Sequence, residues 1–358
     1  MAEIVLGIGT SHTPMLSLRP ELWLTYAEGD KRNPELAFPP HGWVMPFDEG
    51  VQYAADTARE KFKGEAPFPA QAEAFKRSLD TLATTLQTTN PDITVIISDD
   101  QDEWFFEDNM PRFAVYWGES VPMRPRQPNP AGHPEVSKAI SEGYGDIELE
   151  VPIAHEFGRY LVEYLSDNEF DVTHFTHLAQ PYGGQVKRRY PTRTGETDIV
   201  RTTQPREQGL PHGFAFIVKR FFNNQPRPIL PVFQNTCYPP NQPTPKRSYQ
   251  FGQAIARAVS AWDGPGRVAI VASGGLSHFV VDEELDRCLL KALEAGDAQT
   301  LQSLPRERLY SATSESLNWV ALGGAMLEAN LKMELLDYVP VYRSPAATGG
   351  GWAFARWQ

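Results

Sequence analysis

Three short hydrophobic runs, each followed at once by polar residues, constrain the fold of this chain most. The runs are residues 4–8, 93–97 and 268–272. Apolar runs of this length that are rich in β-branched side chains are typical of parallel strands buried on both faces. In open α/β sheets, functional groups gather at the carboxyl ends of such strands. We therefore predict an α/β fold with a central, mostly parallel or mixed sheet flanked by helices, and a site at one edge of that sheet.

The polar residues after the three runs are the first candidates for that site. The first run leads to His12, the third passes a glycine pair before His278, and the second enters an acidic and amide cluster at 99–103. Histidine suits general acid–base chemistry near neutral pH, and carboxylate oxygens bind divalent cations. Each histidine could instead be a hydrogen-bonding loop residue, and the cluster could be a solvated loop.

Composition limits the class of protein. Of the 358 residues, 41% are hydrophobic and 22% charged, as in ordinary globular proteins. An α/β domain can reach this size, so we expect one domain over residues 1–358. The net charge of −12 argues against a nucleic acid or an anionic membrane as the main partner, because both require a basic face.

Cysteine content and hydropathy give a further expectation about location. Cys237 and Cys288 are the two cysteines, and they form no CxxC pair, which argues against a thiolate zinc cluster and a disulfide framework. No segment approaches the roughly 18 apolar residues needed to span a bilayer, and the first residues do not resemble a signal peptide. We expect a cytoplasmic protein without a membrane partner.

Hydrophobic periodicity predicts further elements around the three strands. Helices are expected at 20–28, 48–62, 70–88, 156–166, 212–222, 248–262, 282–295 and 314–331. Strands are expected at 113–117, 170–175, 228–234, 334–341 and 352–356, and loops at 33–46 and 121–133. The polar, basic segment at 180–209 shows no periodicity. We predict a long surface insertion there, and loops of that length are usually functional or flexible.

Several other residues need a functional and a structural interpretation. Glu315 follows Ser and Thr at a predicted helix start, where a glutamate is also a normal capping residue. His212 opens a predicted helix. Gly7 and Gly9, at the end of the first run, lack the third glycine of a dinucleotide loop, so we expect no nicotinamide cofactor. The remaining histidines have no sequence context that supports a functional role: His41, His133, His155, His174 and His177.

The order of short motifs along the chain resembles one protein family. SHTP follows the first strand, and FFEDNMPRFAV follows the second; PHG, PVFQNTCYPP, SGGLSH and ESLNW come after them in that order. This order is similar to that of the class III extradiol ring-cleavage dioxygenases, the superfamily of the protocatechuate 4,5-dioxygenase β subunit. The resemblance extends from residue 4 to about residue 326.

The resemblance implies a single non-heme Fe(II) held by two histidines and one glutamate. His12 matches the first histidine ligand and Glu315 the glutamate. His278 matches the catalytic acid–base histidine. His212 resembles the second pocket histidine, although Pro211 stands where the family pattern has an aspartate.

The chain departs from this family at the second metal histidine. Gln101 occupies that position, and no neighbouring histidine compensates. A glutamine carbonyl is a weaker, neutral donor than imidazole. Three alternatives follow: Gln101 is a ligand, one of Asp99, Asp100 and Glu103 replaces it, or the site binds metal poorly. A carboxylate ligand would add one negative charge and suit a harder metal such as Mn(II).

The resemblance implies an Fe(II)-dependent extradiol-type dioxygenase that opens a catecholic or related phenolic ring with O₂. His278 would exchange the phenolic proton, and His212 would hydrogen-bond a substrate oxygen. Lys246 and Arg247 could hold a substrate carboxylate or be ordinary surface charges. Two other classes remain open, a binding or regulatory protein on a degenerate metal site and a metal-dependent hydrolase. We also expect a homodimer, because proteins of this family tend to associate.

Overall fold

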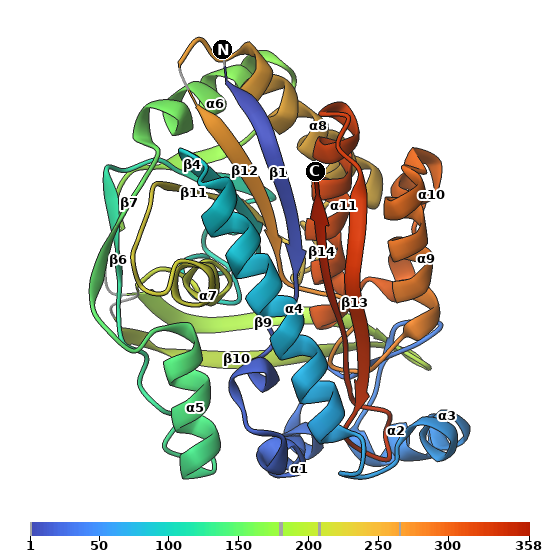
Figure 1. Cartoon of the computed structure of the whole chain (residues 1–358). Coiled ribbons are helices and arrows are strands. Elements are labelled where there is room, and N and C mark those ends of the chain that lie inside the picture. Colours follow the sequence, from blue (N-terminus) through green and yellow to red (C-terminus); the bar gives the residue numbers. More distant parts are fainter. Residues whose placement is uncertain (1, 179–181, 207–208, 265) are drawn as a thin grey trace.

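A mixed sheet of eight strands forms the centre of the described chain (Figure 1). The computed structural model describes residues 2–178, 182–206, 209–264 and 266–358. Across the sheet the strands lie in the order β13 (Met333–Tyr342), β14 (Gly349–Trp357), β1 (Glu3–Thr10), β12 (Arg267–Ser273), β4 (Ile93–Ser98), β11 (Ile229–Gln234), β5 (Phe113–Tyr116) and β8 (Thr173–Phe175). The predicted α/β class, with helices flanking this sheet, is confirmed.

The three strands predicted from the hydrophobic runs are neighbours in this sheet. β1 pairs parallel with β12, β12 with β4, and β4 with β11. β4 is buried at every position, which explains its continuous apolar sequence. β14 and β5 are antiparallel to this centre. The carboxyl ends of β1, β12 and β4 therefore meet at one edge of the sheet, as the sequence pattern predicted.

Helices cover both faces of the sheet (Figure 1). α4 (Phe68–Thr89) and α7 (His212–Phe221) lie on one face, and α8 (Pro245–Ala261) and α11 (Ser316–Glu328) on the other. Gly9 lets α11 approach β1 closely, because a Cβ there would lie 2.5 Å from the Trp319 ring. Within the described ranges, no helix is both long and apolar enough to cross a membrane.

The smaller elements differ from prediction where the apolar pattern is weak. Segments 33–46 and 121–133, predicted as loops, contain β2 (Ala37–Phe38), β3 (Trp43–Val44) and part of β6 (Ser120–Met123). The sequence pattern also missed α5 (Pro134–Tyr144), because its buried positions include Ser137 and Ser141. The remaining elements are α1 (Trp23–Ala27), α2 (Phe47–Tyr53), α3 (Ala55–Lys61), β7 (Leu149–Pro152), α6 (His155–Asp167), α9 (Glu283–Ala295) and α10 (Ala298–Gln302).

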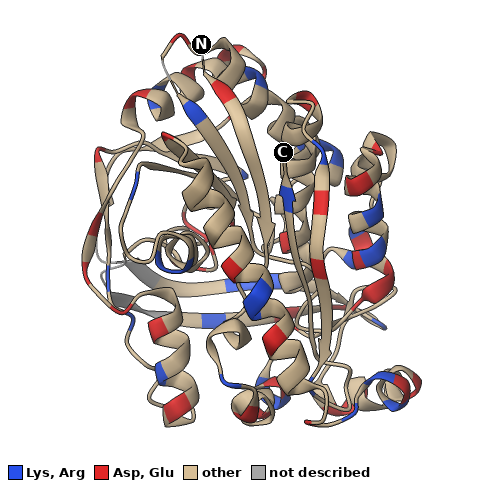
Figure 2. Cartoon of the chain, in the orientation of Figure 1, with Lys and Arg blue, Asp and Glu red and all other residues tan. Residues whose placement is uncertain are grey.

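Within the predicted surface insertion at 180–209, residues 182–206 form a β-hairpin, so the expectation of a long loop without strands was wrong for this part. β9 (Tyr182–Thr192) pairs antiparallel with β10 (Gly195–Arg206), and basic residues mark both strands (Figure 2). Residues 180, 181, 207 and 208 lie outside the described ranges. Val186, Arg188 and Tyr190 form the buried face of β9. A buried arginine in the middle of that face hides the alternation that would otherwise reveal a strand.

Arg188 fixes the hairpin to the acidic cluster that follows β4. Its guanidinium is 3% exposed and donates to both carboxylate oxygens of Asp102, with Nη1 at 2.9 Å from Oδ2 and Nη2 at 2.5 Å from Oδ1. The same guanidinium lies 3.3 Å from the centre of the Tyr238 ring. A buried ion pair with these contacts joins the hairpin to the loop that carries Gln101.

Replacing Arg188 with leucine should therefore destabilise the protein. Loss of one partner leaves the Asp102 carboxylate buried without its counter-charge, which typically costs about 3–5 kcal/mol in the free energy of unfolding. Urea unfolding and limited proteolysis of the hairpin measure the effect. The double variant Arg188→Leu with Asp102→Leu removes both charges and should recover much of the loss. Equal stabilities of the single variant and the parent would contradict the role of this pair.

Candidate metal and catalytic site

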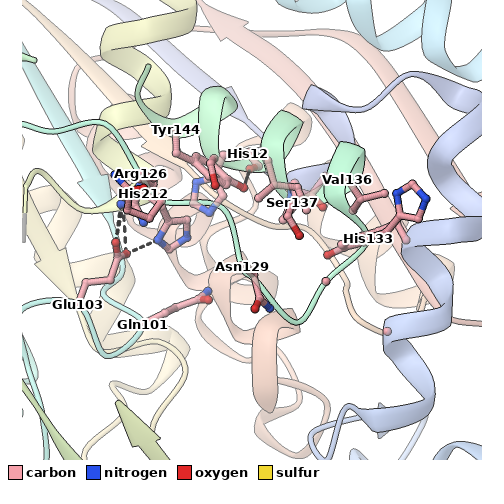
Figure 3. A pocket seen from close by; sticks show the side chains of 18 of the residues that line it. His12, Gln101, Glu103, Arg126, Asn129, His133, Val136, Ser137, Tyr144 and His212 are labelled. Atoms are coloured by element: carbon pink, nitrogen blue, oxygen red, sulfur yellow. Dashed lines mark hydrogen bonds and ion pairs between the residues drawn. The ribbon is translucent and has the colours of Figure 1, made fainter. Parts of the chain in front are cut away.

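The ends of β1, β12 and β4 open into a cavity of about 900 Å³. Thr10 pairs with Ser273, and Ala272 pairs with Ile97, so the three strands end at nearly the same level. The cavity wall contains all five residues selected from the sequence, His12, Gln101, His212, His278 and Glu315. Figure 3 shows His12, Gln101 and His212 on the wall of this cavity. The strand ends and the start of α11 thus bring segments more than 300 residues apart to one site.

The hydrogen bonds of His12 fix its tautomer. Its Nδ1 lies 2.9 Å from Ser273 Oγ, and the Ser273 hydroxyl donates at 2.7 Å to the carbonyl of Gly213. Because the Ser273 hydroxyl donates its one proton to Gly213, its oxygen can only accept from His12 Nδ1–H. In this tautomer His12 Nε2 carries no proton and has a free lone pair. Burial lowers the pKa of His12 to about 3, which favours this neutral form.

Within the part of the chain that the structure describes, the lone pair of His12 Nε2 has no hydrogen-bond partner, although the side chain is only 3% exposed. It lies 3.4 Å from Glu315 Oε2. Two electron-rich atoms that face each other in a buried site repel, and a cation between them would satisfy both. Ligand atoms of His12, Asp99 and Glu315 all lie within 4.8 Å of one another. These residues therefore fit a divalent metal.

Glu315 belongs to this site and makes no capping bond to its own helix. It ends the 3₁₀ turn Ser311–Glu315 and precedes α11, where its side chain forms no cap hydrogen bond. Its Oε1 instead accepts from Gln101 Nε2 at 2.8 Å, and its Oε2 accepts from the backbone N–H of Gly275 at 2.8 Å. Burial alone would raise the pKa of Glu315, but the neighbouring histidines lower it to about 2. The carboxylate is thus ionised within the cavity wall.

His278 lies beside the same carboxylate. Its Nδ1 donates to the carbonyl of Leu276 at 2.8 Å, and its Nε2 lies 3.2 Å from Glu315 Oε1. Thr313 anchors the backbone of the loop, because the His278 N–H donates to the Thr313 hydroxyl oxygen at 3.2 Å. Burial alone would lower the pKa of His278, but the charge of Glu315 raises it overall. This ring is oriented from both nitrogens and faces the cavity.

The acidic and amide cluster separates into residues with different partners. Asp100 accepts from the backbone N–H groups of Glu103, Trp104 and Phe105 at 2.9–3.1 Å, so its carboxylate holds the turn. Asp102 is paired with Arg188. Gln101 and Asp99 remain next to Glu315. Burial, followed by the charge of Glu315, raises the pKa of Asp99 to about 7.

The carboxylate that contacts His212 is Glu103, which belongs to the same cluster. Its Nδ1 contacts Glu103 Oε1, and its backbone N–H lies 3.1 Å from both oxygens of that carboxylate. Arg126 Nη2 donates to Glu103 Oε2 at 2.5 Å (Figure 3). Burial alone would lower the pKa of His212, but the charge of Glu103 raises it to about 9. Glu103 therefore supplies the acidic neighbour that the sequence at Pro211 lacks.

The change Glu103→Gln should lower kcat by about tenfold, because outer partners that orient a functional imidazole typically contribute 10- to 100-fold. The amide keeps the shape of the side chain and removes the charge that holds His212 Nδ1–H. Steady-state kinetics with the metal content measured in parallel provides the readout. Asp108→Asn, an exposed change in the same segment, is the matched control. An unchanged kcat in Glu103→Gln would show that His212 needs no carboxylate partner.

A comparison with known families identifies the chain. Residues 90–349 match the family model described as the catalytic LigB subunit of aromatic ring-opening dioxygenase. This chain belongs to the LigB family. Within the matched range lie Gln101, His212, His278 and Glu315, whereas His12 precedes it.

Individual relatives of this LigB-family chain are distant. A gallate dioxygenase of Pseudomonas putida is 33% identical over 150 residues, which cover 37% of this chain and 42% of that protein. The chain thus matches less than half the length of this relative. The crystal structure of an uncharacterized Escherichia coli K12 protein is 13% identical, with a TM-score of 0.43, and covers 78% of this chain and 91% of that one.

The cavity of this LigB-family chain also contains residues that sequence reasoning missed. Its arginines are Arg32, Arg124, Arg126 and Arg343. The Pro- and Arg-rich composition of segment 121–133 was the available signal for Arg124 and Arg126.

Histidines and basic residues without a clear sequence role divide between the cavity and other parts of the fold. His133 lines the cavity although its sequence context gave no support for a role (Figure 3). Arg247 lies elsewhere, because it donates to the carbonyl of Glu169 and lies over the Phe170 ring. His174 accepts from Trp117 Nε1–H at 3.2 Å and is not among the residues that line the cavity.

Proposed function

We propose that this LigB-family chain is an extradiol-type dioxygenase that uses non-heme Fe(II), with Mn(II) as the alternative metal, to open the ring of a catecholic or related phenolic aromatic with O₂. The observation that supports this most is the buried Nε2 of His12, which finds no hydrogen-bond partner among the described residues and faces the Glu315 carboxylate beside His278. A cavity of about 900 Å³ is within the size range of small-molecule sites.

His12 and Glu315 would hold the metal in this proposal, with a third ligand from the cluster after β4. A bound metal of this kind supplies the electron transfer that lets O₂ react with an electron-rich ring. The protein would contribute fixed ligands and placed proton donors and acceptors. His12 is held in its ligating tautomer by Ser273, so little reorganisation would accompany binding.

His278 and His212 would handle the substrate oxygens. His278 Nε2 is on the cavity wall next to Glu315, and in the neutral ring, whose Nδ1–H donates to Leu276, it would accept the proton of a substrate hydroxyl and return it as the ring opens. His212, held through Nδ1 by Glu103, would donate a hydrogen bond to a substrate oxygen from its other ring nitrogen. In the overall reaction the carbon–carbon bond beside the diol breaks, and both atoms of O₂ enter the product, so no external reductant is needed.

Oxygen uptake by metal-reconstituted protein tests this proposal. With a panel of catechol, protocatechuate and gallate, we expect one O₂ consumed for each ring opened, and incorporation of both atoms from ¹⁸O₂. Activity in protein that is free of metal would contradict it, as would anaerobic hydrolysis of an ester or amide. Tight binding of the aromatics without O₂ uptake would favour a binding protein. Light scattering and cell fractionation test the accompanying proposals of a homodimer and a cytoplasmic location.

A further inference from the structure

We propose that Asp99, and not Gln101, is the third protein ligand of the metal site, so that one imidazole and two carboxylates hold the cation. This inference rests on the proposed metal-dependent function and specifies the ligand set of that site. The starting observation is the proximity of three buried donors, since ligand atoms of His12, Asp99 and Glu315 lie within 4.8 Å of one another. The three residues are 3%, 0% and 1% exposed, respectively.

The hydrogen bonds of Gln101 make its amide a donor at this point. Its Nε2 lies 2.8 Å from Glu315 Oε1 and 3.2 Å from Asp99 Oδ2. Both neighbours are carboxylate oxygens, which accept, so the NH₂ group faces them and the amide oxygen does not. Gln101 therefore bridges the two carboxylates and acts as a positioning residue between them.

Asp99 is held from its other side by a chain of neutral amides. Asn318 Nδ2 donates to Asp99 Oδ1 at 3.2 Å, and Asn318 Oδ1 accepts from Gln234 Nε2 at 3.0 Å. The Gln234 contact fixes which end of the Asn318 amide faces Asp99. Cys237 Sγ lies 3.7 Å from Asp99 Oδ2. This arrangement keeps Oδ2 directed toward Gln101 and the site.

The charge of Asp99 also needs a counter-ion. Among the described residues, the hydrogen-bond donors to this carboxylate are Gln101, Asn318, Cys237 and the backbone N–H of Asp99 itself, and all of them are neutral. A fully buried carboxylate next to a second carboxylate is costly unless it takes up a proton or a cation compensates its charge. The other acids of the cluster have partners already, because Asp102 and Glu103 contact arginines and Asp100 accepts from three backbone N–H groups. Asp99 is thus the carboxylate that a bound cation would satisfy.

This ligand set would differ chemically from one with two histidines and one glutamate. It carries one more negative charge and one more oxygen donor, and oxygen-rich sites favour harder ions such as Mn(II). Replacement of the histidine by Gln101 is then compensated two residues earlier. The amide at position 101 would be retained because it sets the distance between Asp99 and Glu315.

Binding of Mn(II) to the metal-free full-length chain, followed by the electron paramagnetic resonance signal of free Mn(II), tests the assignment. Asp99→Asn should raise the Kd by about 100-fold or more, because affinity for such ions depends on the number of charged ligands. Gln101→Leu should raise it by only about tenfold, as expected for an outer partner. Glu103→Gln removes a different carboxylate from the same cavity and should change the Kd by less than about threefold, since it is no ligand.

A larger loss of affinity in Gln101→Leu than in Asp99→Asn would overturn the assignment, and so would equal Kd values in Asp99→Asn and the parent. If Asp99→Asn does not fold, anomalous scattering from Mn(II) in crystals of the parent gives the answer, since the ion must contact Asp99. A parent that consumes O₂ but binds Mn(II) independently of Asp99 refutes only this inference. A parent that binds Mn(II) through Asp99 without O₂ uptake refutes only the dioxygenase. A parent that binds no metal refutes both.

Discussion

Replacing His12 with alanine should remove the metal from the protein and abolish turnover. Facial-triad sites hold about one ion per chain, so we expect the metal content to fall from about one to less than about 0.1 ion per chain. The reason lies in the fixed tautomer, since Ser273 accepts from Nδ1–H and leaves Nε2 as the free donor atom. Alanine removes the only nitrogen donor among His12, Asp99 and Glu315.

Two further variants separate loss of the ligand from loss of structure. Ser273→Ala keeps the imidazole but frees its tautomer, and should weaken metal binding by about tenfold, as outer partners of ligating histidines do. His174→Ala removes an exposed histidine next to Trp117 and should leave the metal content unchanged. Elemental analysis after dialysis against chelator-treated buffer measures all three. A His12→Ala protein that still carries one ion per chain would exclude His12 as a ligand.

The sequence predicted the centre of the fold because buried parallel strands leave an unmistakable pattern. The apolar runs became β1, β12 and β4, which pair side by side in parallel. Their carboxyl ends therefore share one edge of the sheet. The same logic placed His12 and His278 in one cavity. Glu315 was ambiguous from sequence, since a glutamate at a helix start suits both a cap and a site. In the structure the Glu315 side chain makes no cap hydrogen bond and accepts from the Gly275 N–H instead. This contact depends on the tertiary fold, which the local sequence does not reveal.

The cluster at 99–103 could not be resolved from sequence, because its residues are chemically similar and differ in distant partners. Asp102 pairs with Arg188, 86 residues away, and Glu103 with His212, 109 residues away. Neither partner is implied by local spacing. The hairpin that carries Arg188 was not predicted from the sequence either, because this buried arginine interrupts the alternation of apolar and polar residues along β9. Arg126 lies in a segment of weak periodicity, and its place in the cavity wall was not predicted from the sequence.

Replacing His278 with glutamine should separate chemistry from metal binding. We expect kcat to fall by roughly 10²–10⁴, the usual contribution of a general acid–base group, while the metal content stays at about one ion per chain. Glutamine retains much of the side-chain volume and can still donate toward Glu315, but it cannot exchange a proton near neutral pH. The substrate KM should change little, because the lost function acts on proton transfer and not on ground-state binding.

A second histidine, His41, provides the control for the change His278→Gln. His41→Gln changes an exposed histidine that stacks on Trp43 away from the cavity, and should keep full activity. If His278→Gln loses metal together with activity, the contact between His278 Nε2 and Glu315 Oε1 holds the metal ligand Glu315 in place and is not needed for proton transfer. If it turns over at the parental rate with metal bound, the proton is exchanged elsewhere. His212, held by Glu103 on the wall of the same cavity, is then the next residue to replace.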